Sequence, residues 1–72
     1  MDKLRLEYEI KRNGLTINDF CQEMGMSRSA FYRKCNGISD FTHAEIVKTL
    51  KILNLTTPMG IFFSQEVSEK TQ

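Results

Sequence analysis

The segment MSRSAFYRKCNG, residues 26–37, gathers side chains that can bind nucleic acid. Arg28, Arg33 and Lys34 lie in it, and no Asp or Glu occurs from Met24 to Ser39, whereas elsewhere the bases are interspersed with the nine acids. An arginine guanidinium is a planar fork that matches O6 and N7 of guanine in the major groove of DNA. The alternative interpretation is a solvated helix face, which also gathers cations.

Helical spacing places the polar side chains of this segment on one face. If residues 28–36 form a helix, Phe31 and Cys35 fall on the side that packs against a core, and Ile38 follows to cover that side. The opposite face is free of acids and rich in hydrogen-bond donors. It carries Arg28, Ser29, Tyr32, Arg33 and Asn36. The helix N-terminus near Ser27 adds a partial positive charge that suits a phosphate, so the spacing predicts a surface that reads DNA.

Other residue types that could do chemistry do not form a site. Cys21, Cys35 and His43 are the candidate metal ligands, but structural zinc requires four ligands in closely spaced pairs, which this sequence lacks. We interpret both thiols as small core side chains. No Ser–His–acid group, carboxylate pair or Gly-rich phosphate loop can be assembled. We therefore expect no enzyme, no metal and no cofactor.

The length and composition restrict the class of protein. A chain of 72 residues with a net charge of +1 is expected to form one small domain. The longest apolar run, residues 61–63, is far shorter than the roughly 20 residues of a membrane span. With two cysteines and a charged start, the chain resembles neither a disulfide scaffold nor a secreted precursor. These features predict a cytoplasmic protein that binds no membrane and no small-molecule ligand.

Start and stop signals divide the chain into short helices. Thr16, Ser27 and Thr42 each follow an apolar residue in the pattern of a helix N-cap. Thr42 with Glu45 forms a capping box, and Thr16 with Asp19 forms a shorter version of one. Glycines 14, 25 and 37 occur where helices end in a left-handed residue. The predicted helices span residues 2–13, 17–24, 28–36, 43–53 and 58–64.

The apolar spacing predicts one core to which every helix contributes. Its expected members are Leu6, Ile10, Phe20, Met24, Phe31, Cys35, Ile46, Leu50, Leu53, Leu55 and Ile61. Ile61, Phe62 and Phe63 would spread over roughly 200 degrees of a helix, which is too wide for a small core to cover. They form either a lid with one exposed ring or the contact of a two-fold homodimer, and the pattern favours the dimer.

Two stretches, GLTINDFCQEMGMSRSAFYRKCNG and FTHAEIVKTLKILNLT, resemble the helix-turn-helix family of phage Cro and CI-type repressors, also called the XRE family. The resemblance covers about residues 3–63 and is closest to small Gram-positive phage and mobile-element regulators, through SRSAFYRK.NG, FT..EI, ILNLT and a terminal IFF. It implies an all-α, compact five-helix lambda-repressor-like domain over residues 1–66. Residues 67–72 have too little apolar content to fold alone, so we expect a frayed tail there. The helix-turn-helix would comprise residues 17–24 and the recognition helix 28–36.

Transferred residue by residue, the resemblance implies that Arg28, Ser29 and Arg33 face base edges with Tyr32 beside them. Four further residues match positions near phosphates, and they are Thr16, Asn18, Lys34 and Asn36. The sequence departs from the family at Ile17, where many members have a phosphate-binding Gln. It also departs at Ile10 and Cys35, which replace a buried Arg–Glu pair; two apolar groups avoid its desolvation cost.

Together these features predict sequence-specific binding of double-stranded DNA by a small transcriptional regulator of the repressor or Cro type. Its partners would be a DNA operator and a second copy of the chain. The competing interpretation is a helix-turn-helix module for protein contacts, such as an antirepressor or adaptor, which the low net charge favours slightly. A toxin-neutralising DNA binder ranks last, because such a protein needs a further segment to cover its partner.

Overall fold

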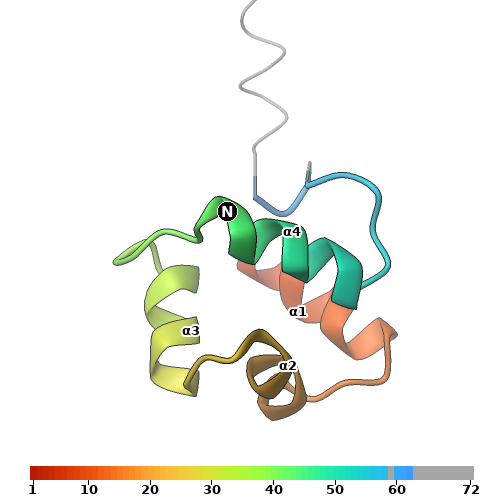
Figure 1. Ribbon diagram of the computed structural model, residues 1–72, viewed down its shortest axis with the longest axis horizontal. Coiled ribbons are helices and arrows are strands. Elements are labelled where there is room, and N and C mark those ends of the chain that lie inside the picture. Colours follow the sequence, from red (N-terminus) through yellow and green to blue (C-terminus); the bar gives the residue numbers. More distant parts are fainter. Residues whose placement is uncertain (59, 63–72) are drawn as a thin grey trace, which may run out of the picture.

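The computed structural model describes residues 1–58 and 60–62, and this part of the chain folds into four helices. They are α1 (Lys3–Arg12), α2 (Ile17–Met24), α3 (Arg28–Cys35) and α4 (His43–Ile52) (Figure 1). No strand occurs among the described residues. The predicted all-α class is therefore confirmed, and the four helices begin and end within one residue of the predicted limits.

Side-chain caps start the helices at the residues that the sequence indicated. The hydroxyl oxygen of Ser27 accepts a hydrogen bond from the Ala30 N–H (3.1 Å). Thr16 and Thr42 cap α2 and α4, each within a complete capping box. Asp2, which the sequence did not single out, caps α1 by accepting from the Arg5 N–H. Each cap satisfies a backbone donor that the helix itself leaves unpaired.

A left-handed residue follows each of the four described helices: Gly14, Gly25, Gly37 and Asn54. Gly25 has φ 73° and lets the Met26 N–H reach back to the Cys21 carbonyl at 3.0 Å. Asn54 takes the same conformation after α4 (φ 58°), and its amide donates to Asn13 Oδ1. Asparagine is one of the few side chains that tolerate this region of backbone space, so it can end α4 where a glycine is commonly found.

α2 is the centre of the packing and contacts each of the other three helices. The rings of Phe20 and Phe31 meet edge to face with centroids 5.8 Å apart, which joins α2 to α3. Both rings are fully buried. Aromatic pairs of this geometry favour one orientation of the two helices beyond what apolar burial alone provides.

Most of the predicted core residues are buried, but the packing face of α4 differs from the prediction. Ile46, Leu50 and Leu55 are only partly buried, whereas Thr49 is 0% exposed. The Thr49 hydroxyl donates to the Glu45 carbonyl at 2.9 Å. Because its own helix satisfies the hydroxyl, threonine can occupy a core position that apolar spacing assigns to a neighbour.

Ile38 does not cover α3 as expected, since its side chain is 72% exposed. Gly37 has φ 82°, and the Ile38 N–H bonds back to the Arg33 carbonyl at 2.9 Å. The chain therefore wraps around the end of α3, and the isoleucine side chain stays in solvent. The prediction that Ile38 covers the inner side of α3 is therefore wrong.

The segment after α4 returns over the fold to the chain start. The Asp2 N–H donates to the Ile61 carbonyl (2.6 Å), and the Phe62 N–H donates to the Pro58 carbonyl (3.0 Å), in a turn. The predicted fifth helix, residues 58–64, falls partly outside the described residues, and so does the predicted domain limit at 66. The predicted tail at 67–72 lies wholly outside them. Within the described chain, no helix is long and apolar enough to cross a membrane.

Candidate nucleic-acid interface

A three-residue connection, Gly25–Ser27, leads from α2 into α3. Met26 within it packs against the core. Phe31 and Cys35 of α3 are buried at 0% and 7% exposure. Since these two side chains fix the inner side of α3, the residues on its other side must face solvent. In Figure 1, α3 stands at one edge of the molecule.

The outward side of α3 carries the predicted base-reading residues. Arg28, Ser29, Arg33 and Asn36 are exposed, and Tyr32 is half-buried. The structure thus brings the predicted set onto one surface, which we call the α3 face: Arg28, Ser29, Tyr32, Arg33 and Asn36. It carries no Asp or Glu. Its donors and its exposure are the properties that contact with bases and phosphates requires.

Two cations, Arg28 and Lys3, lie near the ring of Tyr32. The Arg28 Nη2 donates to the Tyr32 hydroxyl oxygen at 3.2 Å, and the guanidinium carbon is 5.7 Å from the ring centroid. The Lys3 ammonium, from the first turn of α1, is 5.4 Å from the same centroid. The hydrogen bond to Tyr32 and the nearby phenol raise the pKa of Arg28 above its ordinary value, which already keeps an arginine charged at neutral pH.

Two helix N-termini hold three of the predicted phosphate contacts. Ser27 caps α3 and Thr16 caps α2, and both residues are exposed, as is Asn18. Asp19 is bonded to Thr16 in the capping box, and the backbone N–H of Thr16 lowers the pKa of that carboxyl. The α2 start therefore carries a fixed negative charge, whereas the α3 start has no acid in its first turn. Of the two, the α3 start is the better place for an anion.

Lys34 is engaged within the fold. Its ammonium lies 3.1 Å from Glu45 Oε1, donates to the Asp40 carbonyl at 3.0 Å, and sits 5.8 Å from the centre of the Phe41 ring. Burial would raise the pKa of the Glu45 carboxyl, but the Thr42 N–H and the Lys34 ammonium lower it overall. To reach a phosphate, the Lys34 ammonium would have to leave these partners.

The residues predicted for a dimer contact have different positions. Ile61 is 3% exposed and belongs to the core, so it has no surface to offer a second copy of the folded chain. Phe62 is half-buried and meets Phe41 edge to face at 5.1 Å between centroids. Phe63 lies outside the described residues. For the described pair, the arrangement matches a lid on the core.

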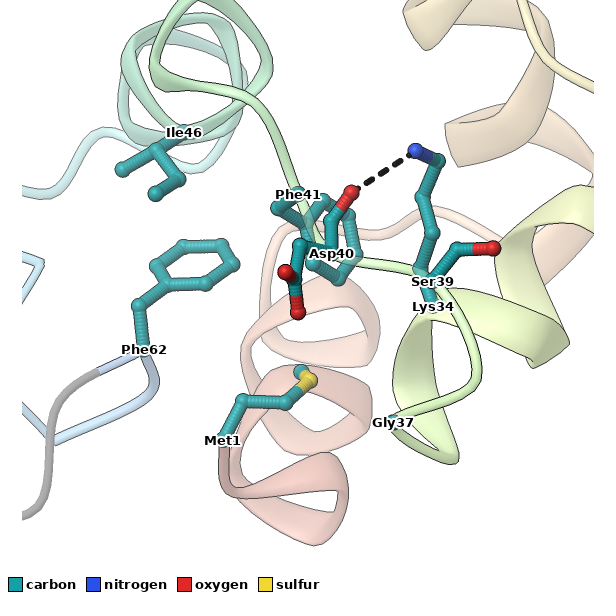
Figure 2. A pocket seen from close by; sticks show the side chains of 8 residues that line it. All are labelled: Met1, Lys34, Gly37, Ser39, Asp40, Phe41, Ile46 and Phe62. Atoms are coloured by element: carbon teal, nitrogen blue, oxygen red, sulfur yellow. Dashed lines mark hydrogen bonds between the residues drawn. The ribbon is translucent and has the colours of Figure 1, made fainter.

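A shallow hollow of about 340 Å³ opens beside Lys34, between the loop that follows α3 and the segment around Phe62 (Figure 2). Met1, Phe41 and Phe62 supply apolar walls. At its edge the Lys34 ammonium donates to the Asp40 carbonyl, drawn as the dashed line in Figure 2.

The two thiols are buried, as their interpretation as core side chains requires. Burial raises the pKa of Cys35 to about 11 and also raises that of Cys21. Since the thiolate is the reactive form and the metal ligand, these raised pKa values disfavour reaction and metal binding of both thiols at neutral pH. Among the described residues, no three His, Cys, Asp or Glu side chains come together as a metal site.

Two charged residues were missed by the sequence analysis. Glu9 is 3% exposed and accepts from Arg5 (3.2 Å) and Arg12 (2.9 Å) on its own helix. Its spacing of four and three residues to these arginines was a readable signal. Lys3 reaches Tyr32 because the fold brings the start of α1 close to α3, and no local pattern predicts that contact.

The described fold is that of a small all-helical domain with a polar, acid-free helix face. No family model matches the chain, and no solved structure matches it at a significant level. A stretch of 52 residues, 71% of the chain, is 38% identical to part of a UPF0735 ACT domain-containing protein from Carboxydothermus hydrogenoformans. The chain spans 36% of the length of that curated relative, whose name does not mention nucleic acid.

Proposed function

We propose that this chain binds double-stranded DNA in a sequence-specific manner and acts as a small transcriptional regulator of the repressor or Cro type. In this proposal α2 and α3 form a helix-turn-helix, and α3 enters the major groove. The observation that carries the proposal is the α3 face. Its donors are exposed because Phe31 holds the other side of the helix in the core, and no acid lies among them. The resemblance to the XRE family points to the same surface.

The roles of the side chains follow from their exposure and reach. Arg28 and Arg33 are long enough to bind guanine edges, and Ser29 can reach a base beside them. Ser27, Asn36, Thr16 and Asn18 would bond phosphates and set the orientation of the domain on the duplex. Lys34 is the weakest of the proposed phosphate contacts, since its ammonium is paired with Glu45.

A regulator of this kind acts where the DNA is, in the cytoplasm, and commonly as a dimer. A two-fold dimer would place two copies of α3 about 34 Å apart and would read a palindromic site. Phe62 and Phe63 remain the proposed contact residues, without the buried Ile61. Palindromic symmetry in the preferred sequence would therefore report on assembly as well as on recognition.

The experiment is a selection of random double-stranded oligonucleotides by the purified chain, followed by affinity measurements over a range of salt. We expect an enriched motif and an affinity that falls steeply with salt as counterions are released. Arg28→Ala and Arg33→Ala should each relax the preference at one base pair, by roughly tenfold to a hundredfold. Lys51→Ala is the matched control, since Lys51 is exposed in the last turn of α4, away from α3 (Figure 1).

The competing function is a protein-binding module, such as an antirepressor or adaptor. If low-salt selection enriches no sequence and the two arginine variants bind DNA like the control, the DNA-reading proposal is wrong. In that case the same α3 face would be the surface to test for a protein partner. A uniform loss of affinity without a change in preferred sequence would instead assign both arginines to phosphates.

A further inference from the structure

We propose that Tyr32 is a positioning residue of the α3 face, which orients Arg28 and gathers Lys3 of α1 onto the same surface. This inference rests on the proposed DNA-binding function and refines it. It changes the role of Tyr32 from a base-reading residue to the support of one, and it adds a residue from a different helix.

The ring of Tyr32 is fixed from below. Tyr32 meets the buried Phe31 edge to face, with centroids 5.3 Å apart and planes at 68°. Phe31 in turn meets Phe20 of α2 at 5.8 Å. A line of three rings therefore runs from the core to the surface of α3, and the phenol at its end has little freedom to move.

Arg28 is fixed by that phenol. Its side chain is exposed, and an unsupported arginine there would sample many rotamers that binding would have to restrict. One residue placed a helical turn later supplies both a hydrogen bond (3.2 Å) and an aromatic surface (5.7 Å). Part of the ordering is thus complete before DNA arrives. Because the tyrosine oxygen accepts from Arg28, its own O–H remains able to donate to a phosphate or base.

Lys3 shares the same support. Its ammonium lies 5.4 Å from the Tyr32 centroid although it comes from the first turn of α1. Among the described residues neither Lys3 nor Arg28 has a carboxylate within ion-pair distance, in contrast to Arg5, Arg12 and Lys34. Two cations held together by one ring create a local positive potential that suits the phosphate next to the base that Arg28 reads.

The first test measures order in the free protein. NMR relaxation of the arginine side-chain Nε–H groups would compare wild type with Tyr32→Phe, which keeps the ring and removes the hydroxyl. Arg28 should be more ordered than Arg33 in wild type and should lose that difference in the variant. Tyr8→Phe, on the exposed face of α1, is the matched control and should change nothing. Equal mobility of Arg28 in wild type and Tyr32→Phe would overturn the inference, whether or not the chain binds DNA.

The second test uses the DNA sequence selected by wild type. Tyr32→Phe should reduce the preference at the base pair read by Arg28 by about threefold to tenfold, the range of one hydrogen bond. It should have no further effect in an Arg28→Ala background, because the two residues act as one unit. Additive losses, or a loss at a different base pair, would instead make Tyr32 a separate reader and refute the positioning role.

Lys3 is tested by the salt dependence. Lys3→Ala should lower the slope of log affinity against log salt by about one without changing the preferred sequence, while Lys11→Ala, in the last turn of α1, should leave it unchanged. An unchanged slope for Lys3→Ala would remove Lys3 from the surface. If wild type prefers no sequence, the proposed function fails, and the relaxation data alone decide whether Tyr32 orders Arg28.

Discussion

Lys34 connects the end of α3 to the start of α4, and we predict that Lys34→Met destabilises the fold rather than weakening DNA binding selectively. The change removes the charge but keeps an unbranched apolar stem. The lost interactions are the ion pair with Glu45 (3.1 Å) and the bond to the Asp40 carbonyl (3.0 Å). The ion pair joins α3 to α4, and the hydrogen bond joins α3 to the loop between them. Loss of both contacts should therefore loosen the position of α3.

The expected size follows from the exposure of the two partners. An exposed ion pair contributes about 0.2–1 kcal/mol, and a hydrogen bond to a charged group about 1.5–3 kcal/mol. The side chains of Lys34 and Glu45 are 15% and 26% exposed, which places the pair between a surface and a buried one. After a discount for this solvent contact, we expect about 1–1.5 kcal/mol. For a small domain that lowers the urea midpoint by about 1 M.

The assay is urea unfolding followed by circular dichroism, for Lys34→Met, Glu45→Gln and the double variant. Lys51→Met is the control for removing an exposed charge. The pH dependence gives a second readout, since the pKa of Glu45 is lowered in the folded chain from an ordinary value of 4.5. A carboxyl group whose pKa is lowered on folding stabilises the fold at pH values above its unfolded pKa. This stabilisation is lost as the pH falls through the folded pKa. The difference between wild type and Lys34→Met should therefore shrink as the pH falls below 4.5.

One pattern of results would refute this reasoning. Lys34→Met and Lys51→Met would unfold at the same urea concentration, and the double variant would equal the sum of the single changes. If Lys34→Met also lowered affinity equally for all DNA sequences, the ammonium would belong to a phosphate contact, and the pairing with Glu45 would be incidental.

Three further predictions address the core and the turn. Glu9→Gln should cost about 1 kcal/mol at pH 7, because its two arginine partners lie about half in solvent; the loss should fade below pH 4.5, and exposed Glu23→Gln should unfold like wild type. Cys21 and Cys35 should react slowly with a thiol reagent at pH 8 in the folded chain and fully in guanidinium, since burial raises both pKa values; rapid labelling of the native chain would contradict their burial. Gly25→Ala should cost about 1 kcal/mol in urea unfolding because φ is 73°, although no atom obstructs the added methyl group; a neutral effect would mean that the turn changes shape.

The sequence predicted what depends on local chemistry. A hydroxyl before a helix and a glycine after it act within a few residues. Thr16 and Gly25 therefore indicated where α2 begins and ends, and Ser27 indicated where α3 begins. Phe31 indicated the inner side of α3 for the same reason, since the helical period alone separates it from Arg28 and Arg33. The α3 face could therefore be predicted without knowledge of the packing partner.

What the sequence did not predict depends on contacts between distant segments. Thr49 was missed as a core residue because threonine is a polar residue type. In the fold its hydroxyl donates to a carbonyl of its own helix, so the side chain can be buried. Lys3 was missed because its contact with Tyr32 joins residues far apart in the chain. The pairing of Lys34 with Glu45 was missed because Glu45 lies beyond the acid-free segment and approaches Lys34 only in the folded chain.

The low net charge of +1 is compatible with a DNA-binding surface because the acids are not distributed evenly. In the described chain, Glu9 is paired with Arg5 and Arg12, and Glu45 with Lys34. These acids neutralise cations that stabilise helices, whereas Arg28 and Arg33 on the α3 face have no carboxylate within ion-pair distance among the described residues. Since salt screens charges beyond about 10 Å, a phosphate near α3 responds to the local excess and not to the sum over the chain. Moving one acid onto this face, as in Ser29→Glu, should therefore abolish DNA binding at physiological salt, although it leaves the core unchanged.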